Sequence, residues 1–214
     1  MKVLILGAAG QVADLLRDNL LKETNDSLVL YARNAHERLT VKDDAREEIV
    51  EGDFLDEEAL KEALTGVDAV YLNDMGNTEA VKAVIKAMKA SQVKRFIGAT
   101  ILGIYNEVGG AFGEWNHAMI GTSPRMQAQK DSAEAVENAD LDYTLLRLTW
   151  LYNEDGNEKY TLTQKGENFT GVQVTRQAVA RLIVDILGDT SDQFIRKSVG
   201  VSEPGTDWEK PSFY

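Results

Sequence analysis

Two glycines near the start of the chain, Gly7 and Gly10, have the spacing of a phosphate-binding turn. They follow an apolar run at residues 3–6 and precede residues 11–21, where apolar side chains recur at helical spacing. Gly7 permits a sharp turn, Gly10 has no Cβ to hold a pyrophosphate away, and Ala13 allows close helix–strand packing. A helix N-terminus also attracts anions through its unpaired N–H groups. The pattern therefore predicts a dinucleotide-binding turn, with an ordinary strand-to-helix turn as the alternative.

An arginine lies where a Rossmann unit places the residue that meets the adenosine ribose, about 20 positions after the glycine turn. Residues 27–31 predict a second strand, and Arg33 follows its C-terminal end. A guanidinium suits a 2′-phosphate, whereas an acid would favour the 2′-hydroxyl of NAD. Arg33 therefore favours NADP over NAD, and a solvated surface arginine is the alternative.

Strands and helices alternate along the chain, and these elements position the candidate site residues. The expected strands continue at residues 48–52, 68–72, 94–98, 142–148 and 194–201, and the expected helices begin after Asp56, at 77–91, at 125–138 and after Thr175. This alternation predicts an α/β fold with a doubly wound parallel sheet. Ligands of such sheets bind at the carboxyl ends of the strands. The residues at those ends are 7–10, Arg33, Asp53, 73–76 and Thr100.

Two segments and the tail break this alternation. Residues 101–123 mix glycines and aromatic residues without a period, which predicts a substrate loop or a segment ordered by its ligand. Residues 150–169 are expected to be loop-rich, with Trp150, Tyr152 and Tyr160 as candidates for a pocket wall. The tail, residues 202–214, is too aromatic to be free, so we expect it to dock on its own domain or on a second subunit of a homodimer.

Composition narrows the class of protein. The net charge of −12 argues against nucleic acid or an anionic membrane as partner, because both need a basic face. The chain has no cysteine, so no thiolate nucleophile, disulfide or thiolate metal site is expected. No signal peptide or membrane span is visible in the sequence. We therefore expect a cytoplasmic protein with one domain, residues 1–214, that acts on a small-molecule substrate.

Four segments together resemble the atypical short-chain dehydrogenase/reductase proteins, the NAD(P)H-binding branch with NmrA-like and flavin-reductase-like members. They are Gly7–Gly10, Gly52–Asp53, Leu141–Arg147 and Val174–Ala180, and the resemblance covers essentially the whole chain. It implies a Rossmann sheet with a small C-terminal lobe on the substrate side and an extended NAD(P).

The resemblance also implies a cofactor site along the carboxyl ends of the strands. It runs from the pyrophosphate, past the 2′-phosphate, the adenine and the ribose, to the nicotinamide and its amide. By position its members are Gly7, Gly10, Gln11, Val12, Arg33, Asp53, Phe54, Asn73, Asp74, Met75, Thr100, Lys130, Leu148, Thr149 and Trp150.

The catalytic pattern of the family is incomplete in this chain. Typical members use a serine with Tyr-x-x-x-Lys, in which the ammonium lowers the pKa of the tyrosine so that it can transfer a proton. Here Lys130 fills the lysine position and would hold the nicotinamide ribose, but Met126 stands in the tyrosine position. Thr100 can replace the serine as donor, which leaves Thr100 and Lys130 as the catalytic candidates. Tyr105 and His117 are alternative proton donors.

Three functions fit these observations. The first is an NADP(H)-dependent oxidoreductase that transfers hydride to a small acceptor such as a flavin or quinone, which needs no protein acid. The second is a non-catalytic NADP-binding redox sensor of NmrA-like type, which the missing tyrosine favours. The third, an epimerase or dehydratase, is weaker because the chain is short for the large substrate domain of those enzymes.

Overall fold

The computed structural model describes the whole chain, residues 1–214, and contains one continuous eight-stranded sheet. Its order is β3-β2-β1-β4-β5-β6-β10-β8, and all neighbours are parallel except β8, which runs antiparallel to β10. From edge to edge the strands are Glu47–Glu51, Ser27–Ala32, Lys2–Leu6, Ala69–Leu72, Arg95–Ile101, Asp142–Leu148, Lys197–Ser202 and Thr161–Gln164. The strand order reverses between β1 and β4, where such sheets bind ligands. The predicted doubly wound sheet is confirmed.

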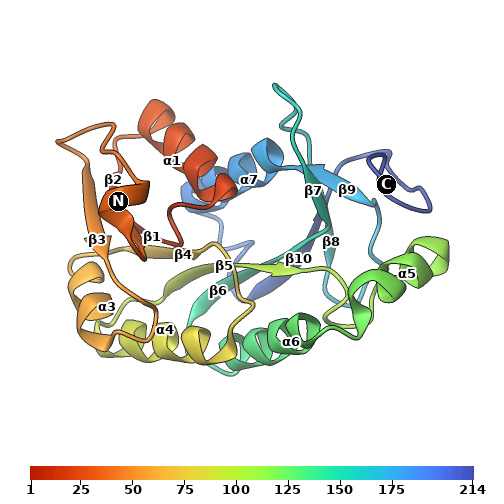
Figure 1. Cartoon of the computed structure of the whole chain (residues 1–214), viewed down its shortest axis with the longest axis horizontal. Helices are drawn as coiled ribbons and strands as arrows, with labels where there is room; N and C mark the ends of the chain where they lie inside the picture. The colour runs from red at the N-terminus through yellow and green to blue at the C-terminus, as the bar shows by residue number, and fades with distance from the viewer.

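Helices cover both faces of the sheet (Figure 1). On one face lie α1 (Gln11–Glu23) and α7 (Arg176–Gly188), and on the other lie α3 (Glu57–Ala63), α4 (Thr78–Ala90) and α6 (Pro124–Glu137). Alternate residues of β1 serve the two cores: Val3 and Ile5 pack with α1 and α7, whereas Leu4 and Leu6 pack toward the opposite helices. This two-residue period is what a strand buried on both sides requires. No helix is long and apolar enough to span a membrane.

Two predicted helix starts are confirmed by their caps. The Asp56 side chain accepts a hydrogen bond from the Ala59 N–H at 3.0 Å, and Thr175 Oγ1 accepts one from the Ala178 N–H at 3.0 Å. A side-chain cap satisfies an N–H group that otherwise lacks a partner in the first helical turn. By contrast, α1 begins after Gly10 and has no side-chain cap, so the N–H groups of its first turn stay available.

The segment 101–123 is more ordered than the sequence predicts. It contains a short helix, α5 (Gly110–Asn116), followed by a π-helical turn, η1 (His117–Gly121). Glycines oppose helix formation, but here Phe112 and Trp115 stack with ring centroids 6.0 Å apart, and Trp115 packs 4.9 Å from Trp150. Tertiary packing therefore sets the conformation of this segment.

Other boundaries also differ from expectation. Strand β5 runs on to Ile101, so that Thr100 lies inside it, and β10 begins at Lys197 rather than at residue 194. Residues 150–169 contain β7 (Trp150–Tyr152) as well as β8, and β7 pairs in parallel with β9 (Gln173–Thr175). Between β2 and β3 the chain forms a single-turn helix, α2 (Ala35–Arg38).

A small lobe stands at one end of the sheet, where α5, β7, β9 and the C-terminal segment meet (Figure 1). The tail docks on its own chain, because the Tyr214 ring lies 5.1 Å from both Trp115 and Trp150 between ring centroids. Phe213 packs 5.9 Å from Tyr152. This is the C-terminal lobe that the resemblance implies.

A buried ion pair fixes α1 to the edge of the sheet. Arg17 of α1 donates from Nη2 to Glu47 Oε2 at 2.7 Å, and both side chains are almost wholly enclosed. The same carboxylate accepts the N–H groups of Lys42 at 2.6 Å and Asp43 at 3.0 Å. Burial alone would raise the pKa of Glu47, but these hydrogen bonds and the charge of Arg17 outweigh it and lower the pKa below its ordinary value.

Glu47→Gln is expected to lower the free energy of unfolding at pH 7 by about 2 kcal/mol, since it removes the charged acceptor of several hydrogen bonds. A lowered folded-state pKa gives stability above the unfolded value, near 4.3, that is lost as the pH falls through the folded value. The difference between wild type and variant should therefore shrink from pH 7 to about pH 3.5. Urea unfolding at both pH values measures it. The exposed neighbour Glu48→Gln is the control, and a pH-independent difference would contradict this account.

Candidate functional site

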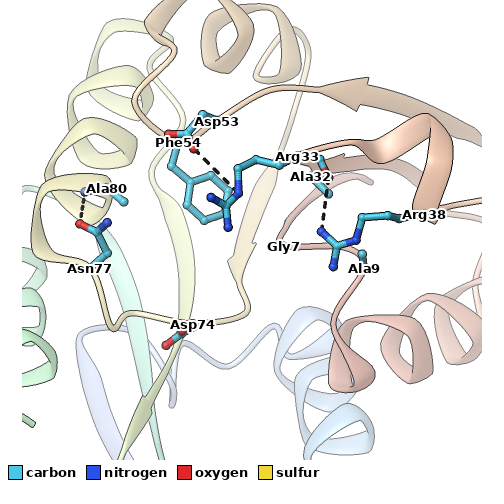
Figure 2. Close-up of a pocket in the computed structure, with 10 residues that line it drawn as sticks. All are labelled: Gly7, Ala9, Ala32, Arg33, Arg38, Asp53, Phe54, Asp74, Asn77 and Ala80. Atoms are coloured by element: carbon cyan, nitrogen blue, oxygen red, sulfur yellow. Dashed lines mark hydrogen bonds and ion pairs between the residues drawn. The ribbon is translucent and has the colours of Figure 1, made fainter. Parts of the chain in front are cut away.

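A cleft opens at the carboxyl ends of β1, β2 and β4, the point where the strand order reverses. Figure 2 shows Arg33 and Arg38 on one side of it and Asn77 and Ala80 on the opposite side. The structure brings together five of the predicted cofactor residues in this cleft. The whole lining is Gly7, Ala9, Ala32, Arg33, Arg38, Asp53, Phe54, Asp74, Asn77 and Ala80.

The glycine turn has the geometry that the sequence predicts. Gly7 has φ +82°, a left-handed conformation that favours glycine, and the Gly10 N–H donates to the Gly7 carbonyl at 3.0 Å. A Cβ on Gly10 would lie 2.2 Å from Asn73 Nδ2. Any larger residue at position 10 would therefore collide with Asn73, which directly follows β4, and would narrow the path by which a ligand reaches the N-terminus of α1. The turn is a cradle that a side chain would fill, which fits a bound pyrophosphate.

Asn73 is held in a fixed orientation beside this turn. The Tyr71 hydroxyl donates to Asn73 Oδ1 at 3.0 Å, so the amide nitrogen faces Gly10. Burial and the nearby Asp74 carboxylate raise the pKa of Tyr71, which therefore remains a donor. The next residue, Asp74, accepts from Arg125 Nη2 at 2.8 Å and from Gln129 Nε2 at 3.1 Å, both on α6.

Two guanidinium groups flank the cleft beside β2. Arg33 is 76% exposed, and its Nε lies 3.9 Å from Asp53 Oδ2. Such an exposed pair is weak, so the guanidinium keeps donors for a ligand. Arg38, on α2, donates from Nη1 to the Arg33 carbonyl at 3.3 Å. Arg38 also borders a hollow on the other side of the turn, with Gly10 and Gln11.

Arg38 is not among the predicted site residues, because the highly charged residues 36–48 indicate a solvent-facing loop or an irregular helix. A usable signal was present: two arginines five positions apart after the second strand. The left-handed Asn34, with φ +51°, turns the chain into α2 and returns Arg38 to the cleft.

Phe54 and Asp53 form the wall where an adenine is expected. The Phe54 ring stacks on Tyr31 with centroids 5.9 Å apart and planes at 20°. The Tyr31 hydroxyl donates to the Asp53 carbonyl at 2.6 Å. Burial and the carboxylates of Asp56 and Asp53 raise the pKa of Tyr31, so its hydroxyl keeps its proton and remains a donor. This hydrogen bond and the ring stacking join the wall to β2.

Several predicted site residues are enclosed and line neither this cleft nor the second cavity described below. Their side chains pack in the interior, and Thr149 Oγ1 donates to the Val172 carbonyl at 2.8 Å. Thr100 is 1% exposed, and its Oγ1 has no hydrogen-bond partner. The enclosed set is Val12, Met75, Thr100, Leu148 and Thr149.

A second cavity lies beside α6, and it contains Lys130 and Met126 one helical turn apart. The Lys130 ammonium lies 3.4 Å from Asn106 Oδ1, and Met126 is 4% exposed. Trp150 does not line this cavity, but its indole Nε1–H donates to Oδ1 of Asn116, a lining residue, at 3.0 Å. The lining consists of Gly103, Asn106, Val108, Asn116, His117, Gly121, Met126 and Lys130.

Of the two alternative proton donors, the structure places His117 in this cavity and Tyr105 outside it. The Tyr105 hydroxyl donates to Glu137 at 2.7 Å and lies 3.2 Å from Ser198 Oγ. Burial and the Glu137 contact raise its pKa, so Tyr105 is a poor acid. Tyr152 and Tyr160 line neither of these two cavities, and their hydroxyls contact Glu203 at 2.7 Å and Asp185 at 2.6 Å.

The strand order, the uncapped helix after a glycine turn and the cleft at the reversal point define a Rossmann dinucleotide-binding protein. The model of a family described as NAD(P)H-binding matches residues 7–190. The chain belongs to this NAD(P)H-binding family, within the atypical short-chain dehydrogenase/reductase proteins. This confirms the predicted resemblance and the nicotinamide dinucleotide cofactor.

Solved structures agree with this assignment. A short-chain dehydrogenase/reductase from Veillonella parvula, in complex with NADP, is 34% identical, with a TM-score of 0.95 over 99% of each chain. A Rossmann-fold NAD(P)-binding family protein from Shigella flexneri is 36% identical, with a TM-score of 0.80 over 100% of this chain and 98% of that one. No curated protein matches the chain in sequence.

Proposed function

We propose that the protein binds NADP(H) in the first cleft and transfers hydride to a small flat acceptor, such as a flavin or quinone, in the cavity beside Lys130. The observation that carries the cofactor choice is the pair of guanidinium groups, Arg33 and Arg38, beside the glycine turn. Two forks of N–H donors suit a 2′-phosphate. The Veillonella relative in complex with NADP supports the same choice.

The chain's own residues then have distinct tasks. The glycine turn and the free N–H groups of α1 bind the pyrophosphate, and Phe54 bounds the adenine. Lys130 holds the nicotinamide ribose at the entrance to the second cavity, where Asn106 positions its ammonium. The bound cofactor supplies the hydride. We also propose that residues 1–214 act as one NAD(P)-binding unit, because one continuous eight-stranded sheet draws its strands from the whole length of the chain.

The proposed acceptor class rests on the lack of a tyrosine proton donor in the second cavity. Met126 has no exchangeable proton, and Tyr105 is turned away from the cavity. A carbonyl substrate needs a proton beside the hydride, whereas reduced flavins and quinones can take theirs from solvent. His117 is the one candidate proton donor left in the cavity, and a flat conjugated acceptor does not depend on it, so we favour such an acceptor over a simple ketone.

The experiment titrates the protein with NADPH and NADH, using the fluorescence of the nucleotide, and then follows loss of NADPH absorbance with flavins and quinones added. We expect tighter binding of NADPH and turnover with at least one acceptor. Binding without turnover across a broad panel would favour the second candidate, a redox sensor of NmrA-like type, which the absent tyrosine supports. Binding of neither nucleotide would overturn both.

Lys130→Ala is expected to reduce kcat/KM for NADPH oxidation about tenfold or more, because it removes a charge-assisted hydrogen bond from the bound state. Steady-state kinetics with the best acceptor measure the effect. Lys89→Ala, which removes an exposed ammonium on α4, is the control and should match wild type. If Lys130→Ala leaves both nucleotide binding and turnover unchanged, Lys130 is not part of the site.

A further inference from the structure

The polar groups in the second cavity face it as donors. Asn116 Oδ1 accepts from the Trp150 indole at 3.0 Å, and Asn106 Oδ1 lies 3.4 Å from the Lys130 ammonium. Each amide oxygen already accepts one hydrogen bond, whereas neither NH₂ group has a protein partner, so both NH₂ groups are free to donate to a ligand. Lys130 itself has donors and no acceptor. The cavity therefore complements a ligand rich in acceptor atoms.

No carboxylate lines this cavity, although the chain as a whole carries a net charge of −12. Glu107, adjacent to Asn106 in sequence, is buried: Arg147 Nη1 donates to its Oε1 at 2.8 Å, and the Tyr105 N–H donates to its Oε2 at 2.9 Å. Asp131, adjacent to Lys130 in sequence, accepts from Gln127 at 2.7 Å. The local charge of the cavity is thus opposite in sign to that of the protein, which favours an anion.

His117 is placed for the same task by its surroundings. It begins the π-helical turn η1, a feature often found at functional sites. A Cβ on Gly121 would lie 2.2 Å from His117 Nδ1, so the imidazole packs in the space that this glycine leaves. The ring thereby lies in the cavity with Lys130, and its N–H is a further donor.

We infer that the acceptor bound in this cavity carries an anionic group, held by Lys130, His117 and the two asparagine amides. The inference rests on the proposed function and narrows it to flat, conjugated acceptors with a phosphate, carboxylate or sulfonate group. Because Met126 leaves Lys130 without a tyrosine to activate, its ammonium serves the acceptor as well as the cofactor.

The test compares two flavins with the same ring system, FMN and riboflavin, which differ by a phosphate. Each is titrated into protein saturated with NADP⁺, which blocks the first cleft and prevents turnover, and binding is followed by flavin fluorescence polarisation. We expect FMN to bind about ten times more tightly than riboflavin, as one lost charge-assisted contact implies. His117→Gln and Lys130→Gln should each lower FMN affinity about five- to tenfold and leave riboflavin unchanged.

Gly121→Ala, which displaces the His117 ring, should reproduce the His117→Gln result, and Lys89→Gln is the control for charge. A second pair, 1,4-naphthoquinone-2-sulfonate and menadione, repeats the comparison with quinones. Equal binding within both pairs, lack of binding in both, or equal losses for the charged and neutral member in the variants would overturn the inference. NADPH affinity and turnover are measured separately. Hydride transfer without a preference for anionic acceptors would therefore refute this inference and leave the proposed function standing.

Discussion

Arg33→Ala together with Arg38→Ala is expected to raise the Kd of NADPH about 100-fold and to change the Kd of NADH less than about threefold. Each guanidinium can give a 2′-phosphate charge-assisted hydrogen bonds worth about 1.5–3 kcal/mol, and about 1.4 kcal/mol corresponds to a tenfold change in Kd. NADH has a hydroxyl at that position and gains little from either group. Nucleotide fluorescence titrations of both cofactors measure the two affinities.

The single variants separate the two arginines. Arg33 is mostly exposed and faces Asp53, whereas Arg38 is tied to the chain through the Arg33 carbonyl. We expect Arg33→Ala and Arg38→Ala each to raise the Kd of NADPH about tenfold. Arg196→Ala, an exposed arginine that pairs with Asp140 beside β10, is the control and should bind like wild type. Equal losses for NADPH and NADH in the double variant would refute the 2′-phosphate assignment.

Glu107→Leu is expected to lower the free energy of unfolding by about 3–5 kcal/mol, because it leaves a buried guanidinium without its counter-ion. Arg147 is fully enclosed in β6, and Glu107 binds its Nη1 at 2.8 Å. The other nitrogens cannot compensate: Nη2 reaches only backbone carbonyls, Thr163 O at 3.0 Å and Ser198 O at 3.3 Å, and Nε has no partner. Urea unfolding followed by far-UV circular dichroism measures the loss.

The double variant Glu107→Leu with Arg147→Met tests the cause. Replacing both members of a buried pair by apolar residues of similar size is often close to neutral, so much of the lost stability should return. Glu114→Gln, an exposed acid on α5, is the control. A loss below about 1 kcal/mol for Glu107→Leu, or no recovery in the double variant, would contradict the ion-pair account.

The parts of the fold that sequence alone predicts are those set by local pattern. The buried runs at residues 3–6 and 27–31, the glycine turn and the caps at Asp56 and Thr175 each depend on neighbours within a few positions. The approximate position of Arg33 also follows from spacing alone. These features locate one cleft and its cofactor class.

What could not be predicted depends on contacts between distant residues. Helix α5 forms despite its glycines because Trp115 meets Trp150 and Tyr214. Tyr105 lies outside the cavity, where its hydroxyl donates a hydrogen bond to Glu137, 32 positions later. Likewise, the residues around Thr100 do not indicate that β5 continues past it and that its side chain is buried.

The packing of Trp115 against Trp150 gives the protein an internal optical label. Two indoles at 4.9 Å, inclined at 57°, are close enough for their strong far-UV transitions to couple, which produces a paired signal in circular dichroism. The third tryptophan, Trp208, is exposed and lies outside that stack. Because Asn116 joins Trp150 to the second cavity, a ligand that shifts α5 would alter this signal without any added chromophore.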